Sequence, residues 1–247
     1  MILAISTIGA GAATYAQEEQ REAEAMAALN KMGGYLRSLK AFQVEAVTTR
    51  EDVLADGEKV QFSGVAKLLA RVPDRLRLDL VSDRRDRQFV YDGKTFSLLA
   101  RRANFYATVD APPTIGQLAD TLEAKYGIDL PLVDLFRWGS PQSKDDDVTS
   151  AMFVGPSEIG GVTCGHYAFR QEGLDWQVWI QLGDYPLPRK LVLTTMTDPA
   201  RPQYVATFTW NLAPSYNDAA FTFVPPQGAG RVVLADLKKD VGASNVQ

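Results

Sequence analysis

The sequence has few of the side chains from which active sites and metal sites are commonly built. Its 247 residues include one cysteine, Cys164, and one histidine, His166. A single cysteine cannot form an intramolecular disulfide, and with one histidine it cannot complete a zinc site rich in those residues. Acidic residues outnumber basic ones by 30 to 26, for a net charge of −4. Because nucleic-acid-binding proteins carry a basic excess, no nucleic-acid partner is expected.

Motifs for catalysis or cofactor binding are also scarce. The glycine-containing stretch GPSEIGG lies between predicted strands, whereas a phosphate-binding loop precedes a helix. We therefore expect no cofactor. His166 lies within a predicted strand, CGHYAF, with no nucleophile motif beside it, and a relay with an acidic residue and a serine remains the enzymatic alternative. The run Asp145–Asp147 is typical of a solvated loop, and no metal is expected.

The N-terminus resembles a secretory signal peptide. ILAISTIGAGAATYA is apolar and shorter than the roughly 20 residues that a membrane-spanning helix needs. It ends with small residues, Thr14 and Ala16, at the positions that a signal peptidase reads. Residues 1–16 are therefore predicted to be a signal peptide, and because the usual basic leader is missing, this signal is expected to be truncated. We expect a periplasmic mature chain with no transmembrane segment and, since Gln17 rather than a cysteine follows, no lipid anchor.

The mature chain alternates between helical and strand patterns. Apolar residues at spacings of three and four predict a helix over residues 18–40. Period-two patterns from Phe42 to Asp110 predict six strands, with hairpins at Asp56–Gly57 and at Asp92–Gly93, the latter as a two-residue type I′ turn. Thr114 is predicted to cap a helix that ends at Gly127, and a short helix is expected over 131–139. Strands resume at 151, and the last is expected over 221–226.

These patterns predict a mainly β fold with helices (α+β). About eleven strands in one antiparallel sheet are expected to curl into a half-barrel, with an N-terminal helix and central lid helices. Residues 17–230 are predicted to form this single domain, and residues 231–247 a polar tail.

The order of elements resembles the LolA family of periplasmic lipoprotein carriers. The resemblance is carried by VYDGKTFSLL at 90–99 and by the closing segment FTFVPPQG at 221–228. A family of uncharacterised predicted periplasmic proteins with the same half-barrel is closer still. The resemblance implies an apolar cavity for acyl chains under a helical lid. In LolA an arginine directly before the proline of the early meander latches the cavity; here Val72 precedes Pro73, which leaves Arg71 as the latch candidate.

Apolar side chains that share strand or helix faces are the candidates for the cavity wall. They are Leu76, Leu78, Leu80, Phe89, Tyr91, Phe96, Leu98, Leu118, Leu122, Phe136, Trp176, Val178, Ile180, Leu191, Leu193 and Phe208. Each set has the alternative of packed core beneath the helices, which is the favoured interpretation for any single residue. For the set as a whole a cavity is predicted, because a curled sheet has more apolar inner surface than three short helices cover. An acyl chain in such a cavity would gain about 0.8 kcal/mol per buried methylene.

The sequence therefore predicts a periplasmic protein that binds a lipid or lipoprotein acyl chain as carrier or sensor, without catalysis. The partners would be a lipid or an acylated protein and, for a sensor, an inner- or outer-membrane protein. Two alternatives remain. One is an envelope stress-sensing domain that binds a membrane partner, and the other is an enzyme that acts on a small apolar substrate.

Overall fold

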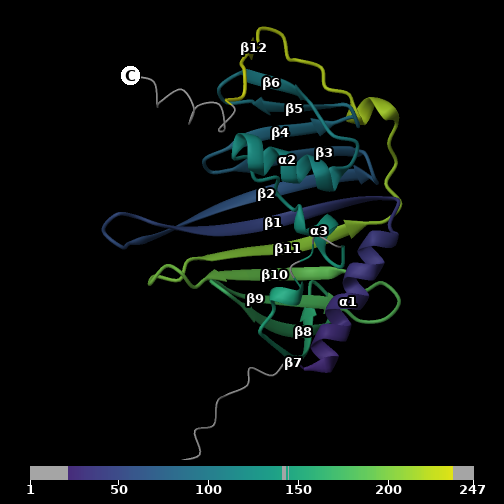
Figure 1. Cartoon of the computed structure of the whole chain (residues 1–247), viewed down its shortest axis with the longest axis vertical. Helices are drawn as coiled ribbons and strands as arrows, with labels where there is room; N and C mark the ends of the chain where they lie inside the picture. The colour runs from purple at the N-terminus through teal and green to yellow at the C-terminus, as the bar shows by residue number, and fades with distance from the viewer. Residues whose placement is uncertain (1–21, 141–142, 144, 236–247) are drawn as a thin grey trace, which may run out of the picture.

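A computed structural model describes residues 22–140, 143 and 145–235. The predicted signal peptide and most of the predicted tail lie outside these residues. A single sheet organises the described chain, with the strand order β12-β6-β5-β4-β3-β2-β1-β11-β10-β9-β8-β7 (Figure 1). All neighbouring strands are antiparallel except β12 and β6. The prediction of one curled, antiparallel sheet is confirmed.

Two meanders make up this sheet. The first follows the N-terminal helix α1 (Ala23–Ser38) and comprises β1 (Ala41–Val53), β2 (Lys59–Arg71), β3 (Arg75–Ser82), β4 (Asp86–Tyr91), β5 (Thr95–Ala100) and β6 (Phe105–Asp110). Between the meanders lie α2 (Ile115–Tyr126), α3 (Asp134–Arg137) and the 3₁₀ helix η1 (Asp145–Asp147). The second meander comprises β7 (Ser150–Ile159), β8 (Val162–Gln171), β9 (Leu174–Gln181), β10 (Pro188–Thr195) and β11 (Gln203–Asn211). The 3₁₀ helix η2 (Asp218–Phe221) and β12 (Gly230–Arg231) end the described chain.

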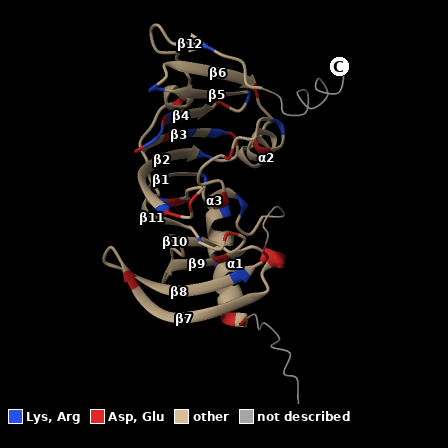
Figure 2. Cartoon of the chain, turned by 90° about the vertical axis from the view of Figure 1, so that its left-hand side faces the viewer, with Lys and Arg blue, Asp and Glu red and all other residues tan. Residues whose placement is uncertain are grey.

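Alternation along the strands separates an inner face, which carries the core, from an outer face. In β3, Leu76 and Leu78 are fully buried on the inner face, whereas Arg77 and Asp79 point to the other side. Helices α1, α2 and α3 lie along the inner face, and the sheet curls around them (Figures 1 and 2). The helices thereby cover the apolar surface that the twisted strands create.

The two meanders meet at the centre of the sheet. Strand β1 pairs with β2 on one side and with β11 on the other, from Gln43 opposite Asn211 to Arg50 opposite Tyr204. β12 and β7 are the ends of the strand order, so the sheet curls without closing. This open shape leaves room for helices on the concave side.

The helices agree with the sequence patterns to different degrees. At the start of α2 the Thr114 hydroxyl accepts a hydrogen bond from the backbone N–H of Gln117. Gly127 ends that helix with a φ of 61°. A left-handed residue after a helix favours glycine, so both boundaries were readable from the sequence. Helix α1 covers Ala23–Ser38, and the first residues of the predicted helix, 18–21, lie outside the described residues. The second central helix is shorter than predicted: α3 covers only Asp134–Arg137, whereas a helix was expected over 131–139.

The predicted turn type between β4 and β5 is wrong. The loop has three residues rather than two, and Gly93 (φ 85°) has a positive φ whereas Asp92 does not, which excludes a type I′ turn. Instead, Asp92 Oδ1 accepts hydrogen bonds from the backbone amides of Lys94, at 2.9 Å, and Thr95, at 2.7 Å. The aspartate side chain thus closes the hairpin.

The predicted last strand over 221–226 is also wrong. Phe221 ends η2, and the residues after it do not join the sheet until β12. Pro225 and Pro226 have no backbone N–H to donate to a ladder. Residues from Asp218 onward instead contact the outer face, where Arg77 donates to the Ala220 carbonyl and Tyr106 packs against Phe223 at a ring distance of 5.4 Å.

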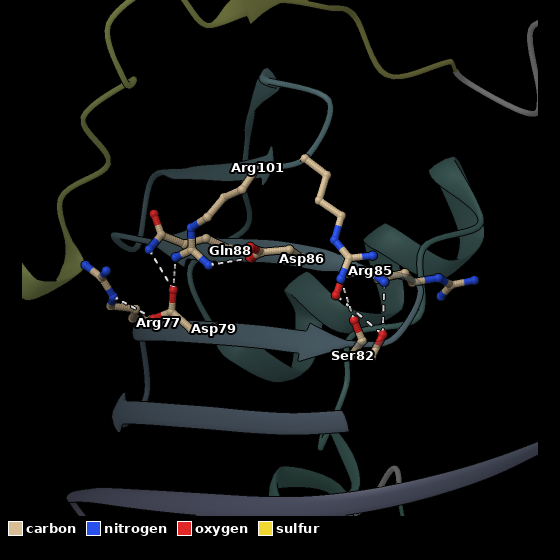
Figure 3. Close-up of polar contacts among 8 residues, drawn as sticks. Arg77, Asp79, Ser82, Arg85, Asp86, Gln88 and Arg101 are labelled. Carbon is tan, nitrogen blue, oxygen red and sulfur yellow. Dashed lines mark hydrogen bonds and ion pairs between the residues drawn. The ribbon is translucent and has the colours of Figure 1, made fainter. Parts of the chain in front are cut away.

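Polar side chains on the outer face of β3 and β4, together with Arg101 just after β5, form a connected network (Figure 3). Asp79 accepts hydrogen bonds from Arg77 at 3.0 Å, from Gln88 at 2.8 Å and from Arg101. Arg101 also pairs with Asp86 at 2.8 Å. This network links β3, β4 and the turn after β5 on the face opposite the α-helices.

Candidate functional site

A pocket of about 470 Å³ opens on the inner face of the second meander. Its apolar lining comes mainly from β9 and β10 and comprises Trp138, Leu174, Trp176, Leu191 and Leu193. Its polar lining comes mainly from the helices and comprises Asp120, Glu123, Asp134, Arg137, Ser143, Asp145 and Gln171. The pocket therefore has an apolar floor under a polar rim.

An ion-pair triad joins the two helices at the rim. Arg137 at the end of α3 lies 2.9 Å from the Asp120 carboxylate and 3.3 Å from the Glu123 carboxylate. Asp120 and Glu123 are three residues apart on α2, a spacing that puts both on one side of the helix. One guanidinium thus holds α3 against α2 beside the pocket.

Helix α1 fixes the other side of α3. A Cβ atom on Gly33 would lie 2.9 Å from the backbone nitrogen of Gly139, so α1 and the chain after α3 approach too closely for any side chain. Arg37 then donates a hydrogen bond to the Trp138 carbonyl at 3.3 Å. Through these contacts the three helices form one connected layer over the inner face.

The pocket floor is held by contacts within the sheet. The Trp176 ring stacks on Phe169, with centroids 4.2 Å apart, and its Nε1 donates to Gln171 at 3.2 Å. Tyr204 on β11 lies nearby on the same face, and burial, together with the charge of Asp134, raises its pKa to about 12. The Tyr204 phenol therefore stays neutral at physiological pH.

The structure places every predicted cavity-wall residue in or against one core cluster on the inner face. Those that are buried are Leu76, Leu78, Phe89, Tyr91, Phe96, Leu118, Leu122, Trp176, Val178, Ile180, Leu191 and Phe208. Leu80, Leu98, Phe136 and Leu193 are partly buried against the same cluster. Of the whole set, Trp176, Leu191 and Leu193 line the pocket. The other members pack against neighbouring side chains, and their role in ligand binding stays a prediction.

Arg71, the predicted latch, contacts the C-terminal segment. Its guanidinium pairs with Asp218 of η2 at 2.7 Å and lies 5.6 Å from the centre of the Phe221 ring. Phe221 is 1% exposed, so its ring anchors the otherwise exposed η2 against the sheet. In this structure Arg71 therefore fastens η2 to the sheet, and a latch role at a cavity stays untested.

His166 and Cys164 lie together on the outer face of β8. The His166 ring stacks on Trp179, with centroids 4.0 Å apart, and its Nε2 lies 2.9 Å from Gln177 Oε1. Cys164 is buried, which raises the pKa of its thiol. Both residues thus lie on the opposite side of the sheet from the pocket, in packed surroundings.

Sequence patterns missed the polar rim. Asp120, Glu123 and Arg137 were not predicted as site residues, because an acidic pair on one helix and an arginine in the next segment are typical of ordinary surface charges. The one signal in the sequence was the three-residue spacing of Asp120 and Glu123, which puts both carboxylates on one side of α2. Asp145–Asp147 form η1, and Asp145 lines the pocket. Among the described residues no group of three or more histidine, cysteine or acidic side chains is arranged to hold a metal ion.

Comparison with protein families supplies an identification. The family model described as "Predicted periplasmic protein (DUF2092)" matches residues 25–235. The chain belongs to this family. The expected membership in a family of predicted periplasmic proteins is confirmed, and the description agrees with the predicted periplasmic location. No helix in the described part of the chain combines the length and the apolar character that crossing a membrane requires.

Other comparisons give more distant likenesses. No curated protein matches the sequence. An uncharacterised conserved protein from Thermus thermophilus is similar over 85% of this chain and 99% of its own, with 12% identity and a TM-score of 0.47. The lipoprotein LppX from Mycobacterium tuberculosis is similar over 79% of this chain and 100% of its own, with 12% identity and a TM-score of 0.46.

A third solved structure belongs to the family that the sequence resembles. The LolA superfamily protein NE2245 from Nitrosomonas europaea is similar over 81% of this chain and 97% of its own, with 9% identity and a TM-score of 0.40. Likenesses of this size do not carry a function from one protein to another.

Proposed function

We propose that this family member is a periplasmic binding protein that holds the acyl chain of a lipid or lipoprotein, as a carrier or sensor. The observation that supports the proposal is the pocket on the inner face, with its floor of leucine and tryptophan side chains under a polar rim. Its volume of about 470 Å³ falls within the roughly 300–1,000 Å³ of small-molecule sites.

An amphiphile suits both parts of this lining. Each methylene that enters the floor contributes about 0.8 kcal/mol, so a few methylenes give useful affinity. The rim carboxylates Asp120 and Glu123 pair with Arg137 but are more than half exposed, so a polar head group at the rim would stay in contact with water. The layer of helices over the inner face supplies the lid that the family resemblance implies.

The enzymatic alternative has less support. The rim residues Asp120, Glu123 and Arg137 are paired with one another across α2 and α3. His166 is on the outer face with an amide partner. A membrane-protein partner, as the sensor alternative requires, stays a prediction.

The proposal is tested by native mass spectrometry of the protein purified from periplasmic extracts and by uptake of a fluorescent fatty-acyl probe. Leu193→Phe puts a larger side chain on the pocket floor and is expected to weaken probe binding about tenfold. Val81→Phe places the same ring on the outer face, where Val81 is 49% exposed, and serves as the control. Absence of any co-purifying lipid together with absence of probe uptake would overturn the proposal.

A further inference from the structure

One arginine on the inner face of the sheet has no counter-ion among the residues that the structure describes. Arg87 follows the alternation of Phe89 and Tyr91 in β4, so its side chain lies on the inner face, and it is partly buried. Among the described residues its guanidinium makes no ion pair or hydrogen bond to a side chain or carbonyl. The exposed Arg85, two residues earlier, is its electrostatic neighbour.

The carboxylates closest in sequence or across the neighbouring turns are engaged elsewhere. Asp86 pairs with Arg101 on the outer face at 2.8 Å (Figure 3). Asp83 accepts the backbone N–H of Ser63 at 2.7 Å, and Asp52 pairs with Arg84 at 3.1 Å. Arg85 and Arg87 are therefore a local excess of positive charge in a chain whose net charge is −4.

The electrostatic environment of Arg87 is unfavourable without a ligand. Burial lowers its pKa, and the nearby charge of Arg85 lowers it further. Partial desolvation of a cation beside a like charge costs free energy unless an anion compensates for it. A planar guanidinium can bind carboxylate or phosphate oxygens through two parallel hydrogen bonds.

Apolar side chains surround Arg87 on the same face. Strand register places Leu80 of β3 and Ala100 of β5 on either side of it, and Phe105 of β6 next to Ala100. Leu80 is partly buried, and Phe105 is 49% exposed. A cationic group flanked by accessible apolar surface suits a molecule that carries an anionic group and a hydrocarbon part.

We propose that Arg87 and Arg85 bind the carboxylate or phosphate of an anionic amphiphile whose apolar part lies on Leu80 and Phe105. This site is on the first meander, separated from the β9–β10 pocket by β2, β1 and β11 in the strand order. It therefore goes beyond the acyl pocket and does not depend on that pocket being occupied.

The test compares laurate, its methyl ester and inorganic phosphate by calorimetry. The wild type is expected to bind laurate about tenfold more tightly than the ester, because the ester has lost the charge. Arg87→Gln is expected to abolish this preference. Lys94→Gln removes an exposed positive charge at the other end of the β4–β5 hairpin and is expected to keep it.

Arg85→Gln provides a second variant, since Arg85 is exposed in a turn and its loss should not affect folding. It is expected to reduce the preference several-fold. Equal binding of acid and ester by the wild type, or an acid preference that survives Arg87→Gln, would overturn the inference and leave the acyl pocket standing. Phosphate binding that depends on Arg87, without laurate binding, would assign the arginines to a free anion and would also overturn it. Failure of laurate and ester alike to bind would overturn the inference, whereas the acyl pocket is judged separately by co-purifying lipid and probe uptake.

Discussion

The Arg137 guanidinium of α3 lies 2.9 Å from the Asp120 carboxylate of α2, and this contact joins two helices that otherwise meet over a small area. Glu123 completes the triad at 3.3 Å. The carboxylates are more than half exposed, 52% for Asp120 and 60% for Glu123. The triad therefore contributes little to the free energy of unfolding, and its main effect is to hold α3 in place against α2 at the pocket rim.

Replacing Arg137 tests this positional role. In Arg137→Gln the free energy of unfolding should fall by less than about 1 kcal/mol, because exposed ion pairs contribute little. Hydrogen exchange of the α2 and α3 amides should become faster, because the helices lose their connection. Arg50→Gln, which breaks the exposed pair between Arg50 and Asp52, is the control and should leave these amides unchanged. Unchanged exchange in Arg137→Gln would contradict the role assigned to the triad.

Two adjacent glycines in α1 should respond oppositely to alanine. Gly33→Ala puts a Cβ 2.9 Å from backbone atoms of Trp138 and Gly139, so a loss of about 1–3 kcal/mol of stability is expected. Gly34→Ala meets only the flexible end of Arg37, at 3.9 Å, and should gain up to about 1 kcal/mol from helix propensity. Chemical denaturation measures both variants. Equal effects in the two would show that α1 does not contact the chain after α3.

The C-terminal segment should depend on Phe221. Phe221→Ala removes a side chain that is 1% exposed, and buried phenylalanine-to-alanine changes cost about 3–5 kcal/mol. We expect this loss to release the segment after β11 and to increase its cleavage by a protease at low concentration. Val224→Ala, at a side chain 75% exposed, should leave the cleavage rate unchanged. Equal cleavage rates in the two variants would contradict the anchoring role of Phe221.

The outer-face network predicts a pH dependence. Burial acts to raise the pKa of Asp79, but hydrogen bonds from Arg101, Gln88 and Arg77 outweigh it, so that the pKa lies below its usual value. Because the unfolded-state pKa of about 3.9 is higher, this carboxylate stabilises the fold above that pH. The contribution is lost as the pH falls from about 4 through the lower folded-state value.

Asp79→Asn should therefore destabilise the protein by about 1–3 kcal/mol near neutral pH. The difference from wild type should stay constant down to about pH 4 and shrink below it. Urea denaturation at a series of pH values measures this. Asp110→Asn, at an exposed position at the end of β6, is the control. If the stability difference between wild type and Asp79→Asn grew as the pH fell, the lowered pKa of Asp79 would be contradicted.

Local patterns in the sequence predicted the elements well. The alternation of Leu76, Leu78 and Leu80 predicted a strand with one buried face, and Thr114 and Gly127 marked the ends of α2. These signals come from residues close together in the chain. The same reliance on local patterns accounts for the wrong prediction of a strand over 221–226. The residues there favour a strand, but no neighbouring strand pairs with them in the structure.

Long-range relations were harder to predict. The pairing of β1 with β11 joins residues that no local pattern connects. The polar rim depends on where α3 lies against α2, and the face that Arg71 occupies depends on the path of the C-terminal segment. Arg87 shows the same difficulty, because an arginine in an alternating strand reveals its missing counter-ion only when the neighbouring carboxylates have been located.

The pairing of β1 with β11 also bears on how the chain folds. Eight residue pairs connect the first strand of the first meander to the last strand of the second. Until residues 203–211 are in place, β1 has one unpaired edge, and such edges promote aggregation. Contacts between residues so distant in sequence form slowly. A chain truncated before β11 should therefore accumulate as an aggregating half-sheet, and each meander protects the other from misassembly.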